Sequence, residues 1–221
     1  SNKISSKGGK ALGEALKYNQ VLQELNIANN ILTDFNQNNS GLVAISNTIP
    51  TMGALEKLLM GANGIKGAEA GKALGDALAA NTVLKELDLS KQSEYTSEKL
   101  DAAFAKEFAV GLGANGAIVS VNILNNGIGV EQAQNFVAIL NAHATLKSLC
   151  GNQGNETELD MSGKDMRVEG AIMLAPEIVA NGAMTSLNVS NNGLNNGGRG
   201  IQAICPAVAA SKITSLDISS N

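Results

Sequence analysis

The chain has 221 residues, a formal net charge of −4 and a sequence pI near 5.1, and this mildly acidic balance argues against nucleic acid as its partner. It contains 24 glycines, 3% aromatic residues and no tryptophan, so leucine and other aliphatic side chains must supply most of its core. No apolar run reaches about 18 residues and no signal peptide is visible, so we expect no insertion into a membrane.

A phrase of spaced apolar residues recurs from one end of the chain to the other. It follows the pattern L-x-x-L-x-L-x-x-N, and its clearest copy is LKELDLSKQ at residues 84–92. When the second apolar position marks each copy, the markers fall at residues 25, 58, 87, 121, 149, 159, 187 and 216. The spacings are 33, 29, 34, 28, 10, 28 and 29 residues, which indicates eight copies with a basic period of 28 to 29 residues.

Helical periodicity fills most of the intervals between the copies. In chain order, the predicted helices lie at or within Lys7–Tyr18, Gly41–Thr48, Gly67–Leu78, Ser93–Ala109, Gln134–Leu140, Ala171–Ala180 and Ile201–Ala210. Pro50 should stop or bend the second of these, and Pro176 and Pro206 should bend the last two or delay their start. In the fourth we expect Ser97 as the N-cap. The inward-facing residues of that unit should be Leu100, Phe104 and Phe108.

The spacing also predicts the curvature of the array. Alternate apolar residues of each phrase point into the core, and the residues between them point to the opposite face. Parallel strands stack about 4.8 Å apart, whereas packed helices need about 8 to 10 Å. The helical side must therefore be the longer arc, with the strands on the concave side. Asn side chains at the end of each phrase offer both a donor and an acceptor, which suits them to bind backbone groups of the turn that follows.

The step of 10 residues between the markers 149 and 159 breaks the pattern, because a parallel crossover normally needs about a dozen residues or more. Two interpretations are open. Leu149–Gly151 is a fragment of a strand, or Gly151–Glu156 is a surface loop inserted into one long repeat. We favour the inserted loop.

The stretch Gly67–Leu78 (GAEAGKALGDAL) followed by Leu84–Leu89 (LKELDL) resembles the ribonuclease-inhibitor-like class of leucine-rich repeats, and the eight copies extend this resemblance over nearly the whole chain. Ile49–Leu58 and Leu149–Ser162 also resemble repeat arrays of single-celled algae and other protists. The resemblance implies an α/β leucine-rich-repeat solenoid, or horseshoe, with a parallel β-sheet on the concave face and α-helices on the convex face.

We expect one leucine-rich-repeat domain over residues 1–221. Asn221 occupies the Asn position of the last copy, and Asn2 lies where the Asn of a preceding copy would fall. Neither end shows the polar cap that repeat arrays need. The chain is therefore predicted to be an interior section of a longer array, with further repeats or a partner covering its ends.

Cys150 and Cys205 lie in different copies and have no metal-like spacing, which favours a reducing compartment. We expect an intracellular, cytoplasmic protein. An organelle is the alternative, because the natural N-terminus can lie upstream of residue 1.

Motifs of enzymes and cofactor-binding proteins are weak here. Gly111–Gly116 matches G-x-G-x-x-G, but it follows a helix and precedes a strand, the reverse of the order in dinucleotide-binding folds, so we interpret it as a turn. His143, the only histidine, is interpreted as a solvated loop residue rather than a catalytic base. We therefore expect no enzyme activity, no catalytic or metal site and no cofactor.

The outward positions of the strands are the best candidates for a partner surface. The candidate residues are Glu24, Asn26, Glu86, Asp88, Asn122, Glu158, Asp160, Asn188 and Asp217. The outward positions hold six acids against one base, Lys57, which gives a local charge of −5 (six minus one). The alternative interpretation is that Asp or Asn between the last two apolar residues is ordinary for this class of repeat, whatever it binds. No Trp, Tyr or Arg, the usual interface anchors, decorates the face.

Function is predicted at the level of class. Repeat arrays present extended surfaces, so we expect a non-enzymatic protein–protein interaction or scaffold module, or a structural subunit of a larger assembly. The partner is then another protein. The alternative, which the resemblance implies, is a regulator of an enzyme, of the inhibitor or GTPase-activating type. Such a regulator would need an Arg or Asn at a loop edge, and neither Arg167 nor Arg199 lies in a recognisable activating motif.

Overall fold

Short parallel strands alternate with helices along the chain. The computed structural model describes residues 2–92 and 100–221. Its strands are β1 (Glu24–Asn26), β2 (Lys57–Leu59), β3 (Glu86–Asp88), β4 (Ser120–Asn122), β5 (Glu158–Asp160), β6 (Ser186–Asn188) and β7 (Ser215–Asp217). Its helices are α1 (Ser6–Leu16), α2 (Ser40–Ser46), the 3₁₀ turn η1 (Ile49–Thr51), α3 (Gly67–Ala80), α4 (Ala102–Ala114), α5 (Val130–Ala142), α6 (Arg167–Ala180) and α7 (Arg199–Ala209).

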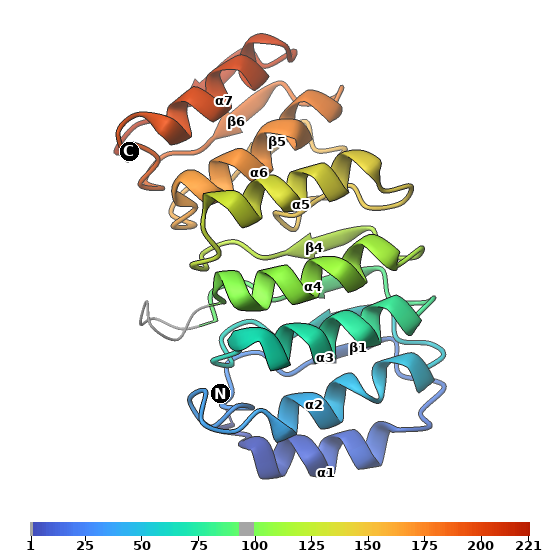
Figure 1. The fold of residues 1–221 in the computed structure, drawn as a ribbon. Helices are drawn as coiled ribbons and strands as arrows, with labels where there is room; N and C mark the ends of the chain where they lie inside the picture. Colours follow the sequence, from blue (N-terminus) through green and yellow to red (C-terminus); the bar gives the residue numbers. More distant parts are fainter. Residues whose placement is uncertain (1, 93–99) are drawn as a thin grey trace.

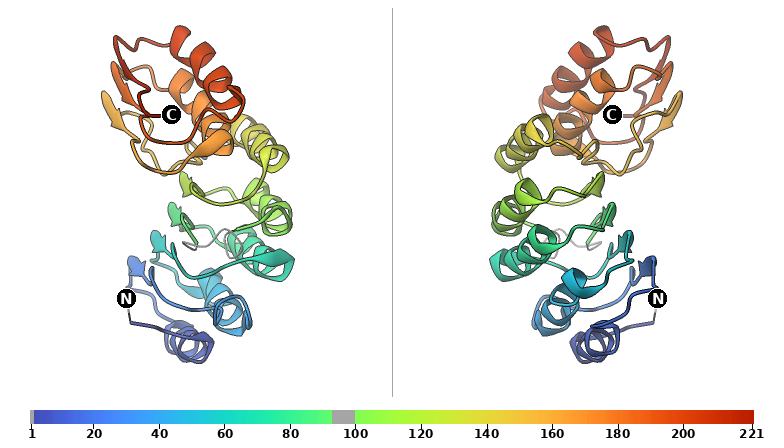
Figure 2. Two further views of the ribbon diagram at one scale, coloured as in Figure 1. Left: turned by 90° about the vertical axis from the view of Figure 1, so that its left-hand side faces the viewer. Right: turned by 90° about the vertical axis from the view of Figure 1, so that its right-hand side faces the viewer.

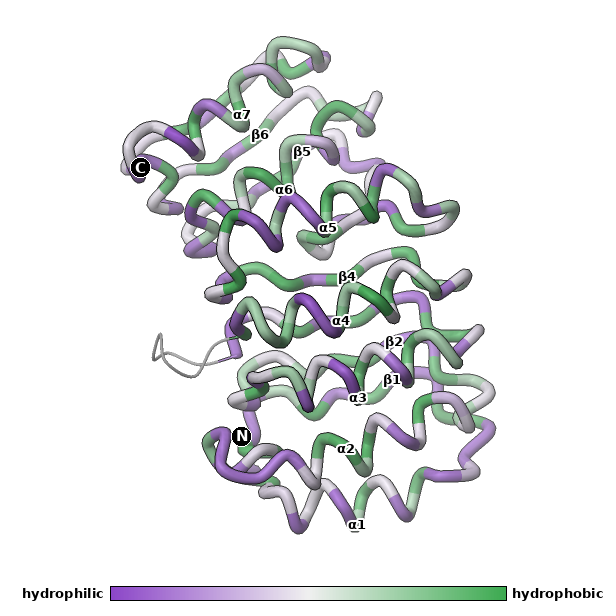
Figure 3. The backbone as a smooth tube through the Cα atoms, viewed as in Figure 1, coloured by the Kyte–Doolittle hydropathy of each residue, from purple (hydrophilic) through white to green (hydrophobic). Residues whose placement is uncertain are grey.

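The units stack in chain order, from α1 at one end to α7 at the other (Figure 1). Seen from the side, the strands line one side of the stack and the helices line the other, and the strand side is concave (Figure 2). Hydrophobic and hydrophilic residues alternate along the helices (Figure 3), as expected for helices that bury one face. The buried apolar residues form one cluster that reaches from Ile27 to Ala207.

The predicted register is confirmed by the strand pairs. Leu25, Leu58, Leu87 and Val121 lie opposite one another along β1 to β4. The markers Leu159, Leu187 and Leu216 do the same along β5 to β7. Most of these side chains are buried, so the alternation of the phrase sets which residues reach the core.

The predicted single sheet is wrong in one respect, because the strands form a sheet of β1 to β4 and a separate sheet of β5 to β7. Between them, Ser148 forms a parallel bridge with Ser120, and Cys150 forms an antiparallel bridge with Asn122. The remaining residues up to β5 contain no helix. Both interpretations of the short step therefore hold in part. Residues 148–150 are a strand fragment on β4, and the loop Gly151–Glu156 follows it, exposed in large part but with Asn152 buried.

The physical reason for the break is the length of the connection. A helix that crosses over between parallel strands needs about a dozen residues or more, and the markers Leu149 and Leu159 are 10 residues apart. The fragment at 148–150 therefore stays on β4, and β5 begins a second sheet.

The helices agree with the predictions except in details of their ends. Ser97 lies outside the described residues, and the N-cap of α4 is Asp101, whose carboxylate accepts a hydrogen bond from the Phe104 N–H at 2.8 Å. A late start for the proline-containing helices is wrong, because Pro176 and Pro206 lie inside α6 and α7. Buried residues on both sides of Pro176 hold α6 in place by packing, which outweighs the one backbone hydrogen bond that proline removes.

Glycines let two helices approach backbone to backbone. A Cβ atom on Gly111 of α4 would overlap the carbonyl of Gly75 on α3, and one on Gly71 would overlap the carbonyl of Phe104. The aromatic rings of the core lie beside this contact, with Phe108 between Phe104 and Phe136 at centroid distances of 5.5 and 6.3 Å. Small residues thus bring α3 and α4 close.

A ladder of side-chain amides ties successive units together, as predicted for the Asn position. Asn63 Nδ2 donates to the carbonyl of Met60 in its own turn at 3.0 Å and to that of Ile27 in the preceding unit at 2.9 Å. The amide oxygen of Gln92 accepts from the Asn63 N–H at 3.1 Å. The same pattern holds at Asn126, Asn192 and Asn221. Each amide therefore pairs buried backbone groups at the ends of two neighbouring strands.

Candidate functional site

The first residue of each strand points outward, and these residues form the first outward column of the concave face. In β1 to β3 this residue is charged. Glu24, Lys57 and Glu86 are neighbours across β1, β2 and β3. Lys57 Nζ lies 3.1 Å from Glu86 Oε2. The hydrogen bond to Glu86, and then its negative charge, raise the pKa of Lys57. The one predicted base therefore sits inside the acidic column and is paired there. On the second sheet, Glu158 continues the column beside Ser186.

The third residue of each strand also points outward, and these residues form the second outward column. Most of them have a structural role. At six positions the side-chain oxygen accepts a hydrogen bond from the backbone N–H two residues later, at 2.8 to 3.2 Å. These positions are Asn26, Asp88, Asn122, Asp160, Asn188 and Asp217. Such bonds form the turn that ends each strand, and they lower the pKa of Asp160 and Asp217. These six residues therefore have a structural role that does not depend on any partner. One oxygen of each carboxylate is used, and the negative charge remains on the face.

The nine candidate residues do not form one uninterrupted surface. Five lie on the first sheet, and Glu158, Asp160, Asn188 and Asp217 lie on the second. Between the two groups, Ser120, Leu124, Ser148 and Cys150 occupy outward positions of the repeat phrase, but all four are buried. The cause is the sheet break, because residues 148–152 fold against the end of β4 rather than continuing the row of strands.

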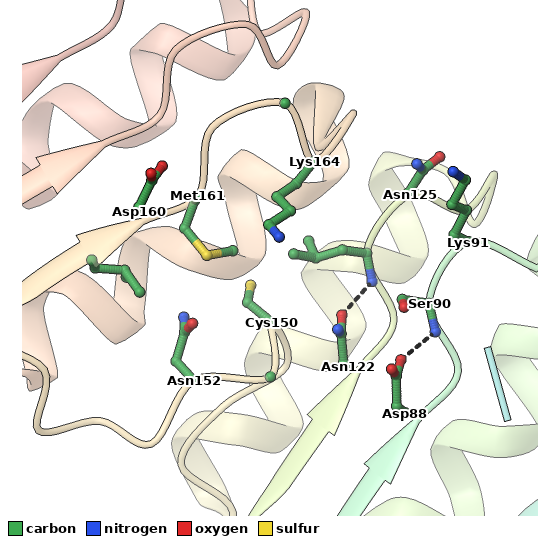
Figure 4. A pocket seen from close by; sticks show the side chains of 14 residues that line it. Asp88, Ser90, Lys91, Asn122, Asn125, Cys150, Asn152, Asp160, Met161 and Lys164 are labelled. Atoms are coloured by element: carbon green, nitrogen blue, oxygen red, sulfur yellow. Dashed lines mark hydrogen bonds between the residues drawn. The ribbon is translucent and has the colours of Figure 1, made fainter. Parts of the chain in front are cut away.

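A pocket of about 590 Å³ lies on the concave face at this break. Figure 4 shows its walls, which come from the ends of β3 and β4, from residues 150–152 and from β5 with the turn that follows. Three candidate residues line it, namely Asp88, Asn122 and Asp160. It therefore gathers predicted residues from both sheets around one cavity.

Two lysines that the sequence prediction left out also line the pocket. Lys91 follows β3 and Lys164 follows β5. Together they balance the charges of Asp88 and Asp160, so the pocket has two acids and two bases among its lining residues. Lys164 occupies the Asn position of its repeat, and that departure from the pattern was the available signal.

Glu177 of α6 lies buried beneath the break, with 5% of its surface exposed. Its Oε1 atom accepts from the backbone N–H groups of Leu149 at 2.7 Å and Cys150 at 3.2 Å. Its Oε2 atom accepts from Ser148 Oγ at 2.8 Å and Asn152 Nδ2 at 2.9 Å. The Leu149 N–H would donate to the next strand in an unbroken sheet, so the carboxylate takes the place of that strand. Burial raises the pKa of Glu177, and hydrogen bonds from the Leu149 N–H and from the Ser148, Asn152 and Cys150 side chains offset part of the rise.

The thiol beside this carboxylate is suited to packing rather than to chemistry. Burial raises the pKa of Cys150 well above its usual value, and the charge of Glu177 adds to the rise. A thiol becomes a nucleophile or a metal ligand only as the thiolate. Within residues 2–92 and 100–221, no three His, Cys, Asp or Glu side chains come together as a metal-binding group.

His143 is half-buried and holds a turn, so its prediction as a solvated residue is wrong. Its Nδ1 atom accepts from the N–H groups of Thr145 at 3.2 Å and Leu146 at 3.0 Å. Asn81 Oδ1 makes the equivalent bonds after α3, at 2.9 and 2.7 Å. His143 therefore replaces the asparagine that ends the helix in other units, and its proton must sit on Nε2.

Arg167 bears on the alternative prediction of an enzyme regulator. Its side chain makes two hydrogen bonds of 3.0 Å to the neighbouring Asp165.

No helix in the described part of the chain combines the length and apolar character of a membrane span.

Comparisons with known proteins identify no family. No protein-family model matches the chain, and no curated protein matches it. Among solved structures it is similar to one titled "Leiomodin-1 Actin-Binding Site 2 (ABS2)", with 10% sequence identity and a TM-score of 0.44. That likeness covers 91% of this chain and 86% of the other. A similarity of this degree assigns neither a family nor a function.

Proposed function

We propose that residues 1–221 form one leucine-rich-repeat domain of the ribonuclease-inhibitor-like type, a horseshoe solenoid that binds another protein through its concave strand face. The observation that carries the proposal is the set of polar side chains at most outward positions of both sheets, on either side of the pocket between β4 and β5. An array of short strands presents a long surface, which suits a protein partner better than a small molecule. Two unpaired cysteines, one buried and one exposed, suit an intracellular, reducing compartment.

The charges of the face indicate where the partner presents a basic group. Asp88 and Asp160 reach the pocket from different sheets, and Glu158 lies two residues from Asp160 on the same strand. A lysine or arginine side chain entering between these acids would pair with both sheets at once. Lys91 and Lys164 on the same pocket would repel a second basic group. The partner surface is therefore basic at one point and polar around it.

The test uses substitutions that remove charge without removing the turns. The variant is Glu86→Gln, Asp88→Asn, Glu158→Gln and Asp160→Asn together. Asn keeps the oxygen that accepts the backbone N–H at positions 88 and 160, so the strands should end as before. The matched control makes the same change in charge on the helices, with Glu14, Glu107, Glu131 and Glu169 replaced by Gln.

Binding partners would be isolated with the unmodified chain, purified, and measured by association kinetics at several salt concentrations. We expect the concave variant to associate about tenfold more slowly at low salt and to lose most of its salt dependence, because its steering charges are gone. The helix variant should resemble the unmodified chain. An unchanged association rate in the concave variant would place the partner on the helices or on the Gly151–Glu156 loop, and the proposal would fail.

A further inference from the structure

Six Asn-Gly steps occur in the chain, and the structure separates one of them from the rest. They begin at Asn63, Asn115, Asn126, Asn181, Asn192 and Asn196. An Asn-Gly step can rearrange without an enzyme. The glycine nitrogen attacks the Asn side-chain carbonyl carbon, a new C–N bond closes a succinimide ring, and ammonia leaves. Water then opens the ring to aspartate or to isoaspartate. Glycine favours this reaction because it has no Cβ to block the approach.

Five of the six asparagines are held in conformations that oppose this attack. Their exposed surface is only 1, 4, 7, 3 and 1% at Asn63, Asn115, Asn126, Asn181 and Asn192. In each, the side-chain NH₂ donates to at least one backbone carbonyl of a neighbouring unit, at 2.6 to 3.0 Å. These are the amides that join one repeat to the next. They can react only after the unit opens, and opening costs free energy.

Asn196 differs in each of these respects. It is exposed, in the loop between β6 and α7. Its backbone carbonyl accepts weakly from the Arg199 N–H at 3.4 Å and Arg199 Nε at 3.5 Å. In the described chain, no hydrogen bond holds its side-chain amide. Gly197 and Gly198 follow with φ angles of 61 and 77°, in the left-handed region that glycine enters freely.

We propose that Asn196 is a site of spontaneous deamidation in the folded protein, and that the fold protects the other five Asn-Gly steps. The only co-reactant is water. The product gains one negative charge three residues before α7 begins at Arg199. An aspartate there is favourable beside the helix N-terminus. An isoaspartate adds one main-chain atom between residues 196 and 197, and so displaces the Asn196 carbonyl from the Arg199 N–H.

The test is peptide mapping by mass spectrometry after the full chain is incubated at mildly alkaline pH, once folded and once in concentrated urea. At each step, conversion of the side-chain amide to an acid and the isoaspartate content are measured. We expect Asn196 to convert at least about tenfold faster than any of the five buried sites in the folded chain, since those react only from opened states. In urea all six should convert at similar rates, because the same dipeptide is then equally free.

Two variants sharpen the result. Asn196→Gln should abolish the charge variant that forms on incubation, because glutamine would have to close a larger ring. Asn195→Gln, one residue away and not followed by glycine, should leave the reaction unchanged. Conversion of Asn196 at the rate of the buried sites in the folded chain would overturn the proposal. The proposal would also fail if the six sites differed in conversion rate by the same factors in urea as in the folded chain. The sequence around each site, and not the fold, would then set the relative rates.

Discussion

Replacing Glu177 tests how the two sheets are joined. Its carboxylate accepts from the backbone N–H groups of Leu149 and Cys150. It also accepts from the side chains of Ser148 and Asn152. Glu177→Leu leaves both backbone donors without an acceptor, and each buried unpaired donor costs about 1 to 3 kcal/mol. Loss of a buried charge recovers part of its desolvation cost. We therefore expect the free energy of unfolding to fall by about 2 to 4 kcal/mol.

Urea unfolding measures this loss, and hydrogen exchange locates it. Faster exchange should appear first at the Leu149 and Cys150 N–H groups, whose acceptor has gone, while the β2 and β3 amides stay protected. Glu169→Gln is the control, because it removes a similar charge eight residues earlier on the same helix, and no hydrogen bond joins Glu169 to residues 148–152 in the described part of the chain. Two results together would contradict this prediction. The free energy of unfolding of Glu177→Leu would lie within about 1 kcal/mol of that of the unmodified chain, and exchange at the Leu149 and Cys150 N–H groups would be unchanged. The carboxylate would then not hold the strand fragment at residues 148–150.

The pH dependence of the same residue has a definite sign. Burial raises the pKa of Glu177 above its ordinary value of 4.5 in spite of its four donors. A carboxyl group whose folded pKa is raised contributes stability that is fully present below its unfolded pKa and is lost as pH rises through the folded value. Relative to Glu177→Gln, which cannot ionise, the unmodified chain should therefore lose stability as pH increases above about 4.5. Unfolding free energies of the two proteins measured across this range give the difference. If the unmodified chain instead gained stability relative to Glu177→Gln as pH rose, hydrogen bonding to the carboxylate would outweigh its desolvation.

Two further predictions concern turns and helix contacts, and both are checked by urea or thermal unfolding. His143→Asn should leave stability unchanged or raise it, since Asn makes the same bonds after α3. His143→Leu should lower the free energy of unfolding by about 1 to 3 kcal/mol because two N–H groups lose their acceptor. Equal stability of the two variants would contradict this prediction. Gly111→Ala should cost about 1 to 3 kcal/mol because its Cβ meets the backbone of Gly75, while the control Gly113→Ala, whose Cβ touches only the Ile139 side chain at 3.9 Å, should gain about 0.5 to 1 kcal/mol.

The repeat phrase predicted the strands and their register because it encodes a local alternation. Leu58 and Leu87 are separated by one period and lie opposite each other, and the same spacing places Leu187 opposite Leu216. The role of the Asn position was also predictable, because an amide at the end of every strand meets the same unpaired backbone groups. Such features depend on a residue and its copy one repeat away, which a sequence displays directly.

The junction could not be predicted in the same way, because it depends on contacts that occur once. Glu177 lies in a helix whose other buried residues are apolar, and nothing in the local sequence marks it as an acceptor for residues 25 to 29 positions earlier. His143 replaces an asparagine by shape and by one acceptor nitrogen, which the residue type does not announce. Lys91 and Lys164, which line the pocket, follow β3 and β5 rather than lying within them. They were missed because only strand residues were predicted to face the partner.

The short step between the markers 149 and 159 accounts for the pocket as well as for the broken sheet. With a full period at this point, a helix would intervene, β5 would pair directly with the fragment at 148–150, and the outward columns would pass over the junction without a gap. The shortened connection instead turns Cys150 and Asn152 away from the row of strands and leaves Asp88 and Asp160 on different walls of one cavity. A periodic array would offer a partner the same surface at every unit. The irregular unit gives the described part of this face a position that is chemically unlike its neighbours, and under the proposed function this position would fix the register of the bound partner.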